Sequence, residues 1–288
     1  MTSPAYTNSR RGLLYVAIAV IFFSTTPVFI RWADSISSYE IAFWRLLVAA
    51  VMLRIAMWIK GERWTVSRPE WRTFAIFGLI TALHFLFYIA SLNFTTIAHS
   101  LAIVYTAPIF VALFSAIFLG ERIARRKWLG ILLAVVGVGV LAGFQPQFTK
   151  SMLLGDVLAL GSAITFGLYS VAGRSQRNSH SLFTYAMTIY GAAALWALLP
   201  ATLSFTPGGY TPLAILSIIA LGVLPLGIGH TLYNAALRHT HATYVNVIAT
   251  QEVTGGILLG IIFLRETPAP NEIAGVVITL LGILTVIL

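Results

Sequence analysis

Glu252 stands in the middle of an otherwise apolar run near the end of the chain. The stretch ATQEVTGGILLGIIFLRE, from Ala249 to Glu266, belongs largely to the apolar segment Thr243–Phe263, and at about 1.5 Å of rise per residue Glu252 falls near the centre of that segment. An ionised carboxylate at the centre of a membrane costs several kcal/mol unless it is paired, solvated or protonated. We therefore expect Glu252 either to bind a substrate amine or a coupling proton, or to be a neutral group that hydrogen-bonds to another helix.

Arg45 lies about two turns inside the apolar segment Tyr39–Ile59. Its guanidinium could pair with Glu252 or clamp a substrate carboxylate. The alternative is a side chain that extends to the membrane surface while its aliphatic part stays in the apolar layer. A phosphorylated or nucleotide-linked substrate would need several basic groups at this depth, so the pattern favours an amphipathic solute over a strongly anionic one.

Four residues of the segment Phe74–Phe94 share one helix face, because they are spaced four, three and four positions apart. They are Phe77, Thr81, His84 and Tyr88. This face combines aromatic rings with hydrogen-bonding groups, which suits the wall of a polar cavity. His84 could contact a substrate or carry a proton there, and its alternative role is that of a satisfied packing group.

Further polar residues lie on later segments. One stripe carries Thr243, Asn246 and Thr250, and the segment before it carries His230, Tyr233 and Asn234. Threonine and asparagine in membranes often only tie neighbouring helices together. The candidates for substrate contacts that we retain are Asn246, Thr250, Tyr233 and, from the fourth segment, Tyr105. No cluster of histidines and carboxylates has the spacing of metal ligands, so no metal site is expected.

Three prolines inside apolar segments are candidate hinges: Pro27, which follows the polar run Ser24–Thr26, Pro108 and Pro225. Proline donates no N–H to the helix and so frees a carbonyl, which allows a bend or a polar contact. The alternative for each is a tolerated kink.

The elements that position these residues follow from hydropathy. Of the 288 residues 58% are apolar and 9% charged, with a mean hydropathy of +0.89, which is typical of an all-α integral membrane protein. A membrane-spanning helix needs roughly 20 apolar residues. The chain divides into ten such segments: Gly12–Trp32, Tyr39–Ile59, Phe74–Phe94, Ile97–Leu119, Trp128–Phe144, Leu154–Gly173, Leu182–Ser204, Leu213–Leu237, Thr243–Phe263 and Ile273–Leu288.

Basic residues between the segments predict the orientation. Alternate connections hold most of them, while the opposite connections hold Arg31, Lys150 and Arg265. Because basic residues near span ends resist translocation, we predict that both termini are cytoplasmic and that the protein is a multi-pass protein of a bacterial inner membrane. This topology accounts for the net charge of +9, so no nucleic-acid partner is expected. The residues on the predicted cytoplasmic side are Arg10, Arg11, Lys60, Arg63, Arg68, Arg72, Arg122, Arg125, Arg126, Lys127, Arg174, Arg177 and Arg238.

The two halves of the chain resemble each other, which predicts repeats over residues 11–145 and 152–288. Each repeat holds five segments, an odd number, so the second copy must cross the membrane in the opposite sense. Four basic residues follow Glu121 in LGERIARRKWLG, whereas none follows Glu266 in LRETPAPNEIAG, as expected for inverted repeats. A shift of 145 positions pairs Tyr88 with Tyr233, Glu121 with Glu266, Gly130 with Gly275 and Gly137 with Gly282, and a shift of 143 pairs Phe23 with Phe166.

Two pairs of residues are expected to have structural roles. Gly139 and Gly143 stand four positions apart, which predicts close packing of their segment against a neighbouring helix. Glu121 and Glu266 lie at segment ends, where we expect caps or ion pairs.

Two five-segment halves, each with a fourth segment that runs into FLGE or FLRE and a fifth that opens with a glycine, resemble the EamA domains of the drug/metabolite transporter superfamily. The resemblance covers essentially the whole chain, and the amino-acid and metabolite exporters, including the YddG-type aromatic amino-acid exporters, are the nearest analogues. Pro108 matches a proline typical of the fourth segment, and Glu252 a glutamate common in the second half, where Val253 replaces the proline. The resemblance implies that segments one to four and six to nine surround a cavity, with five and ten peripheral.

We therefore expect a secondary transporter that exports small metabolites, foremost amino acids of aromatic or otherwise amphipathic character, by alternating access. The alternative within transport is an efflux carrier of drugs and lipophilic cations, and that of another class is a non-transporting receptor or assembly subunit. The sequence has no HExxH, Walker or G-x-S-x-G motif, so neither enzyme activity nor a cofactor is expected. The expected partners are a small-molecule substrate and the lipid bilayer.

Overall fold

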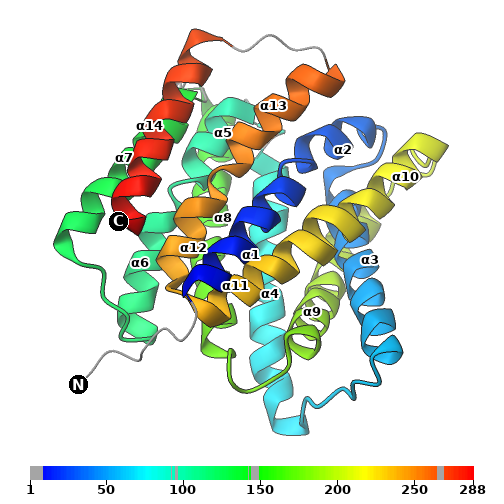
Figure 1. Ribbon diagram of the computed structural model, residues 1–288. Coiled ribbons are helices and arrows are strands. Elements are labelled where there is room, and N and C mark those ends of the chain that lie inside the picture. The colour runs from blue at the N-terminus through cyan, green and yellow to red at the C-terminus, as the bar shows by residue number, and fades with distance from the viewer. Residues whose placement is uncertain (1–8, 92, 95–96, 142, 144–148, 265–268) are drawn as a thin grey trace.

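The structure, a computed structural model, describes residues 9–91, 93–94, 97–141, 143, 149–264 and 269–288. These residues form helices joined by short connections, with no β-strand among them (Figure 1). In chain order the helices are α1 (Ser9–Phe23), α2 (Thr26–Trp32), α3 (Ser38–Ile59), a 3-10 turn (Arg68–Glu70), α4 (Trp71–Ser91), α5 (Ile97–Val104), α6 (Ala107–Phe118), α7 (Arg125–Leu141), α8 (Lys150–Ser175), α9 (Leu182–Leu203), α10 (Pro212–Leu221), a π-helical segment (Gly222–His230), α11 (Thr231–His239), α12 (Ala242–Ala249), α13 (Glu252–Leu264) and α14 (Pro270–Ile287).

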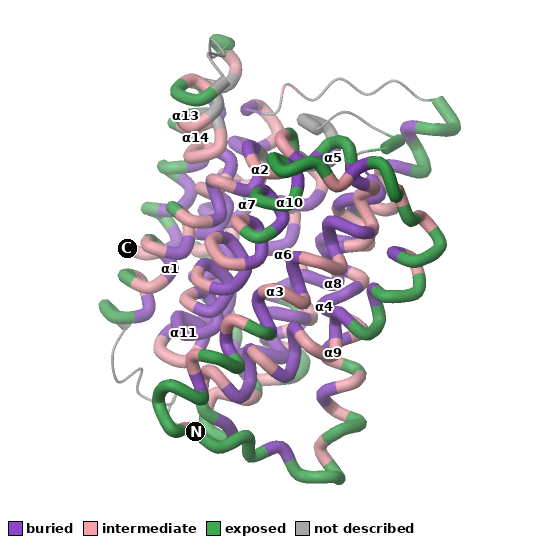
Figure 2. Tube along the Cα trace, turned by 90° about the vertical axis from the view of Figure 1, so that its right-hand side faces the viewer, coloured by how far each residue is buried: buried purple, intermediate pink, exposed green. Residues whose placement is uncertain are grey.

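Seven helical stretches of the described chain are long and apolar enough to cross a membrane. They are Arg10–Trp32, Ser38–Ile59, Arg68–Ser91, Lys150–Ser175, Leu182–Leu203, Pro212–His239 and Ala242–Phe263, and shorter apolar helices cover Ala102–Phe118 and Ile273–Ile287. Many apolar side chains are exposed on the outside of the bundle; Leu195, Leu199 and Val157, for example, are about two-thirds exposed or more. Figure 2 shows how exposed and buried positions alternate along the helices. Such a surface belongs to a multi-pass membrane protein.

Helices α7 and α14 pack side by side and run antiparallel (Figure 1). At one end Lys127 Nζ donates to the carbonyl of Val286 at 2.8 Å, and at the other Asn271 Nδ2 donates to the carbonyl of Leu141 at 3.2 Å. The start of each helix therefore lies beside the end of the other. Helices α3 and α9 also run antiparallel. Ser37, just before α3, donates its backbone N–H to Thr206, just after α9, and the indole of Trp64, which follows α3, donates to Thr188 near the start of α9.

Glycines allow α7 and α14 to approach closely. A Cβ on Gly130 would lie 2.7 Å from the carbonyl oxygen of Gly282, and one on Gly137 would lie 2.9 Å from that of Gly275. The contact predicted for Gly139 is wrong, because a Cβ there would meet no described atom within 4 Å. Gly139 lies on the face of α7 turned away from α14, because two residues advance a helix by about 200° from Gly137.

Three apolar helical stretches are interrupted near their middle. The breaks lie at Ser24–Thr25 between α1 and α2, at 105–106 between α5 and α6, and at 250–251 between α12 and α13. At each break a threonine hydroxyl donates to the carbonyl three residues earlier, at 2.7 Å: Thr25 to Phe22, Thr106 to Ile103 and Thr250 to Val247. Such bonds compete with the helical ladder. Prolines in the first turns of α2 and α6 reinforce the first two breaks.

The candidate hinges thus occupy different local structures. Pro27 lies in the first turn of α2, although its side chain is outside the described part of the chain, and Pro108 lies in the first turn of α6. Pro225 lies inside the π-helical segment, where the wider turn leaves room for a residue without an N–H.

Replacing Gly137 by alanine is expected to destabilise the protein, since the new Cβ would lie 2.4 Å from the backbone nitrogen of Thr279. Overpacking of this kind costs about 1–3 kcal/mol, so the midpoint of thermal unfolding in detergent should fall by several degrees. Gly139→Ala is the matched control on the same helix, and it should be neutral or slightly stabilising because alanine favours a helix over glycine by about 1 kcal/mol. Equal losses in the two variants would contradict the packing described here.

Candidate functional site

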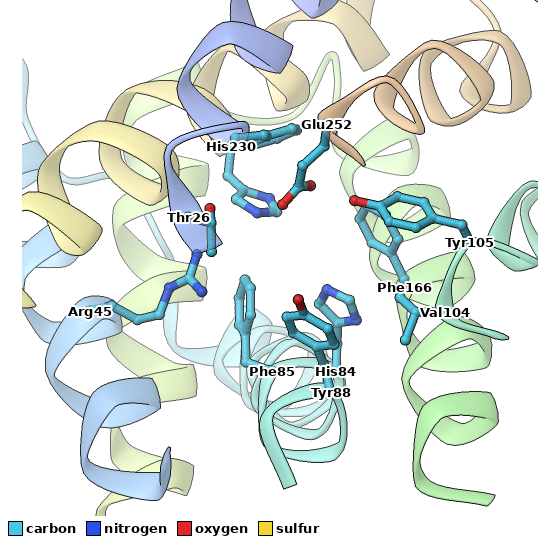
Figure 3. Close-up of a pocket in the computed structure, with 11 residues that line it drawn as sticks. Thr26, Arg45, His84, Phe85, Tyr88, Val104, Tyr105, Phe166, His230 and Glu252 are labelled. Carbon is cyan, nitrogen blue, oxygen red and sulfur yellow. The ribbon is translucent and has the colours of Figure 1, made fainter. Parts of the chain in front are cut away.

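A small cavity lies where the broken helices meet (Figure 3). The residues that line it are mostly polar and aromatic and come from α1, α2, α3, α4, α5, α8, the π-helical segment, α13 and the break between α5 and α6. They are Phe23, Thr26, Arg45, His84, Phe85, Tyr88, Val104, Tyr105, Phe166, His230 and Glu252. The structure therefore brings together Arg45, His84, Tyr88, Tyr105 and Glu252 of the candidates that the sequence provides.

Arg45 faces the cavity and not the membrane surface. Its side chain is 2% exposed, and its guanidinium carbon lies 4.6 Å from the centre of the Phe85 ring, a cation–π contact. The alternative that Arg45 extends to the surface is thus wrong, because α3 turns this side chain toward α4 and the cavity. Its Nε has no hydrogen-bond partner among the described residues, so the guanidinium retains capacity to bind an anionic group.

Glu252 is the first residue of α13 and faces Arg45 across the cavity (Figure 3). The hydroxyl of Tyr105, at the break between α5 and α6, hydrogen-bonds with its carboxylate, and Arg45 interacts with it electrostatically. The N-terminal end of a helix also favours a negative charge. Glu252 is therefore held by a residue of the first half of the chain, although it belongs to the second.

His84 forms part of the cavity wall on α4. Its ring stacks on Phe166 with 4.6 Å between ring centres and 15° between planes, and its Nδ1 lies 3.1 Å from the carbonyl oxygen of Ser162. Both partners belong to α8. The imidazole is thus fixed by two contacts from the other half of the chain.

Five candidates do not line the cavity and bond elsewhere. Thr81 donates to the carbonyl of Phe77, whose ring packs into the apolar core, and Thr250 donates to Val247. Tyr233 bonds with Ser170 at 2.7 Å and accepts from Asn246 at 3.1 Å. Tyr88 and Tyr233 were expected to flank one site, but only Tyr88 lines the cavity. Tyr233 lies behind Phe166, with 5.6 Å between the two ring centres.

Sequence reasoning did not select six of the lining residues. Thr26 adjoins a candidate hinge, and His230 is one of several polar groups in its segment. Phe85, Val104 and the repeat-related pair Phe23 and Phe166 give no polar signal in an apolar segment. The repeat offered a clue, because residues aligned with a cavity residue of one half have a raised chance of lining the cavity in the other.

At one end of the bundle, the carboxylate of Glu40 joins the start of α3 to the loop after α9. It accepts hydrogen bonds from the backbone N–H and the hydroxyl of Thr206, at 3.0 and 2.6 Å, and from the hydroxyl of Tyr210. Burial and the bond to Glu40 raise the pKa of Tyr210, so its hydroxyl stays protonated and donates. We refer to these three residues as the Glu40 cluster.

A second carboxylate, Glu121, lies at the opposite end of the bundle. Arg174 at the end of α8 donates to it from Nε and Nη2, both at 2.9 Å, and donates to the carbonyl of Leu237 at 2.7 Å. Burial lowers the pKa of His241, whose ring is 3.9 Å from Glu121, so Arg174 is the cation that neutralises this carboxylate at pH 7. Glu121, Arg174 and His241 form the Glu121 cluster; the equivalent Glu266 lies outside the described residues.

The cavity measures about 40 Å³. This volume holds water, but pockets that bind small molecules are typically about 300–1,000 Å³. The cavity can therefore hold a larger solute only if its walls move apart.

Comparison with known proteins gives the family context. The chain is 28% identical to the pseudopaline exporter of Pseudomonas aeruginosa, over 92% of each chain, and 25% identical to a probable terminal-alkyne amino-acid exporter of Streptantibioticus cattleyicolor, over 94% of this chain and 91% of that protein. An uncharacterised transporter of Archaeoglobus fulgidus is 26% identical over 96% of each chain.

One solved crystal structure shares the fold, with a TM-score of 0.83 over 95% of each chain and 20% sequence identity. The model of the EamA-like transporter family matches residues 10–143 and again residues 153–288. The chain therefore belongs to the EamA-like transporter family.

Proposed function

We propose that the protein is a secondary transporter of the bacterial inner membrane that exports amino acids or closely related small metabolites by alternating access. The observation that carries this proposal is the placement of Glu252 and Arg45 on facing walls of one cavity, with aromatic rings between them. The likeness to a pseudopaline exporter and to a probable terminal-alkyne amino-acid exporter supports an exporter of small metabolites such as amino acids.

The architecture that we propose is ten membrane helices in two inverted repeats, residues 11–145 and 152–288, with both termini cytoplasmic. Two family matches over nearly the same ranges support the repeats. The antiparallel pairing of α7 with α14 supports the inversion, because these are the repeat-equivalent last helices. Gly130 is equivalent to Gly275, and Gly137 to Gly282. Gly130 contacts Gly282, and Gly137 contacts Gly275, so the two contacts exchange when the equivalent positions are exchanged.

The site chemistry suits a zwitterion. Glu252 is an acceptor for an ammonium group, and Arg45 offers a guanidinium with a free Nε to a carboxylate. Phe85 and Phe166 line the space between them, which suits an apolar or aromatic side chain. A lipophilic cation would find Glu252 and the rings favourable but would lie beside the buried positive charge of Arg45, so multidrug efflux is the weaker candidate.

In this mechanism the two end clusters alternate. The Glu121 cluster, beside the basic residues Arg122, Arg125 and Arg126, would close the cytoplasmic end, and the Glu40 cluster would close the outer end. Each joins the first half of the chain to the second. Separation of the halves at one end therefore breaks one cluster while the other holds.

Glu252→Gln is expected to slow amino-acid efflux from proteoliposomes at least tenfold, because the neutral amide gives up a charged hydrogen bond worth about 1.5–3 kcal/mol. The measurement loads vesicles with labelled amino acids and, separately, a cationic dye, with and without a pH gradient. Asp34→Asn, which makes the same chemical change at an exposed carboxylate, is the control and should transport normally. Absence of flux of either solute in the wild type would rule out the proposed function. An amino-acid flux that is unchanged in Glu252→Gln would contradict only the proposed role of Glu252.

Opening either end cluster is expected to expose the cavity to one side only. The chain contains no cysteine, so a single Thr26→Cys in the cavity wall reports access of a membrane-impermeant maleimide without background. With Glu121→Gln, labelling from the cytoplasmic side should rise about tenfold or more, because loss of one partner of a buried ion pair costs about 3–5 kcal/mol. With Glu40→Gln, labelling from the outer side should rise instead. Equal increases from both sides would indicate general loosening and contradict the assignment.

A further inference from the structure

The hydrogen bonds of His84 define which of its ring nitrogens carries the proton. Nδ1 lies 3.1 Å from the carbonyl oxygen of Ser162, and a carbonyl oxygen can only accept. The Ser162 hydroxyl lies 3.0 Å from Nδ1, but its own proton is directed to the carbonyl of His84, also at 3.0 Å. Both groups of Ser162 near Nδ1 are therefore acceptors, so Nδ1 is the donor.

The consequence concerns the other nitrogen, Nε2. A neutral imidazole carries one N–H, so with Nδ1 protonated Nε2 holds a lone pair and can only accept a hydrogen bond. Stacking on Phe166 and the bond to Ser162 fix the ring plane, and Figure 3 shows the ring at the cavity wall with one nitrogen directed inward. Nδ1 is bound to α8, so the nitrogen that faces the cavity is Nε2.

Two acceptors thus face one space. His84 offers Nε2 and Glu252 offers a carboxylate, from α4 and from the start of α13. Glu252 already takes one hydrogen bond from Tyr105, which leaves further acceptor sites on its oxygens. A ligand that satisfies both residues needs a cation with at least two N–H donors.

We propose that His84, held in the Nδ1–H tautomer by the backbone carbonyl of Ser162, is a specificity-determining residue that accepts a hydrogen bond from the substrate ammonium group. The cavity then selects primary amines over quaternary ammonium compounds of equal charge. This inference rests on the proposed function and deepens it, because Glu252 alone would attract both kinds of cation by charge.

The test uses wild-type proteoliposomes, the labelled amino acid that they export fastest, and the N,N,N-trimethyl derivative of the same amino acid. We expect the wild type to prefer the primary amine at least tenfold in kcat/KM, since an acceptor left without a donor in the cavity weakens binding. His84→Asn places an amide near the Nδ1 position but nothing at Nε2, so KM for the primary amine should rise about tenfold and the preference should fall. His84→Gln reaches the Nε2 position and should retain more of the preference.

Two further measurements separate the possible failures. Nitrogen-15 NMR of labelled histidine, assigned by comparison with His84→Asn, should show the Nδ1–H tautomer in the wild type and in Ser162→Ala, which keeps the carbonyl. An Nε2–H tautomer would overturn the inference even if transport is normal, as would wild-type KM and preference in His84→Asn. If the wild type exports no amino acid, the proposed function is wrong. The NMR spectrum then still shows, independently of transport, whether Nε2 of His84 is an acceptor.

Discussion

A carboxylate and a guanidinium that line one cavity inside a membrane protein constrain the helices around them. Isolated in an apolar layer, either charge would cost several kcal/mol, so each must be held by partners that no single helix can supply. Arg45 lies over Phe85 of α4, and Glu252 is held by Tyr105 at the break between α5 and α6. The helices must therefore converge, and three of them are interrupted where they do so. A break in a helix makes backbone N–H and C=O groups available for hydrogen bonds, whereas a continuous helix offers only its side chains.

Glu252 of the second half faces Arg45 and Tyr105 of the first half, so the site exists only while the halves are assembled. His84 follows the same rule, with Ser162 and Phe166 on the opposite half. The clusters at the two ends of the bundle are also made between halves. A relative movement of the halves thus changes the cavity and its exits together, which is the geometrical condition for coupling access to binding.

The all-helical, membrane-spanning character of the fold could be predicted from hydropathy, because hydropathy depends on many residues at once. The charged and polar members of the cavity could be found because a polar group in an apolar segment is conspicuous, as with Glu252 and His84. Phe85 and Val104 could not, because an apolar residue that faces a cavity resembles one that faces lipid. The assignment of Gly139 to a helix contact failed for a related reason: spacing gives a face of a helix but not the neighbour that the face meets.

The break between α5 and α6 differs in its chemistry from the break between α12 and α13. Between α5 and α6 a proline ring adds to the hydroxyl of Thr106, whereas between α12 and α13 only the hydroxyl of Thr250 competes with the helix, with Val253 in place of the proline. Proline fixes its backbone angle permanently, while a hydroxyl can rotate and release its carbonyl. The first joint is therefore stiff and the second compliant. The interrupted helix that carries the carboxylate is therefore also the one that can straighten.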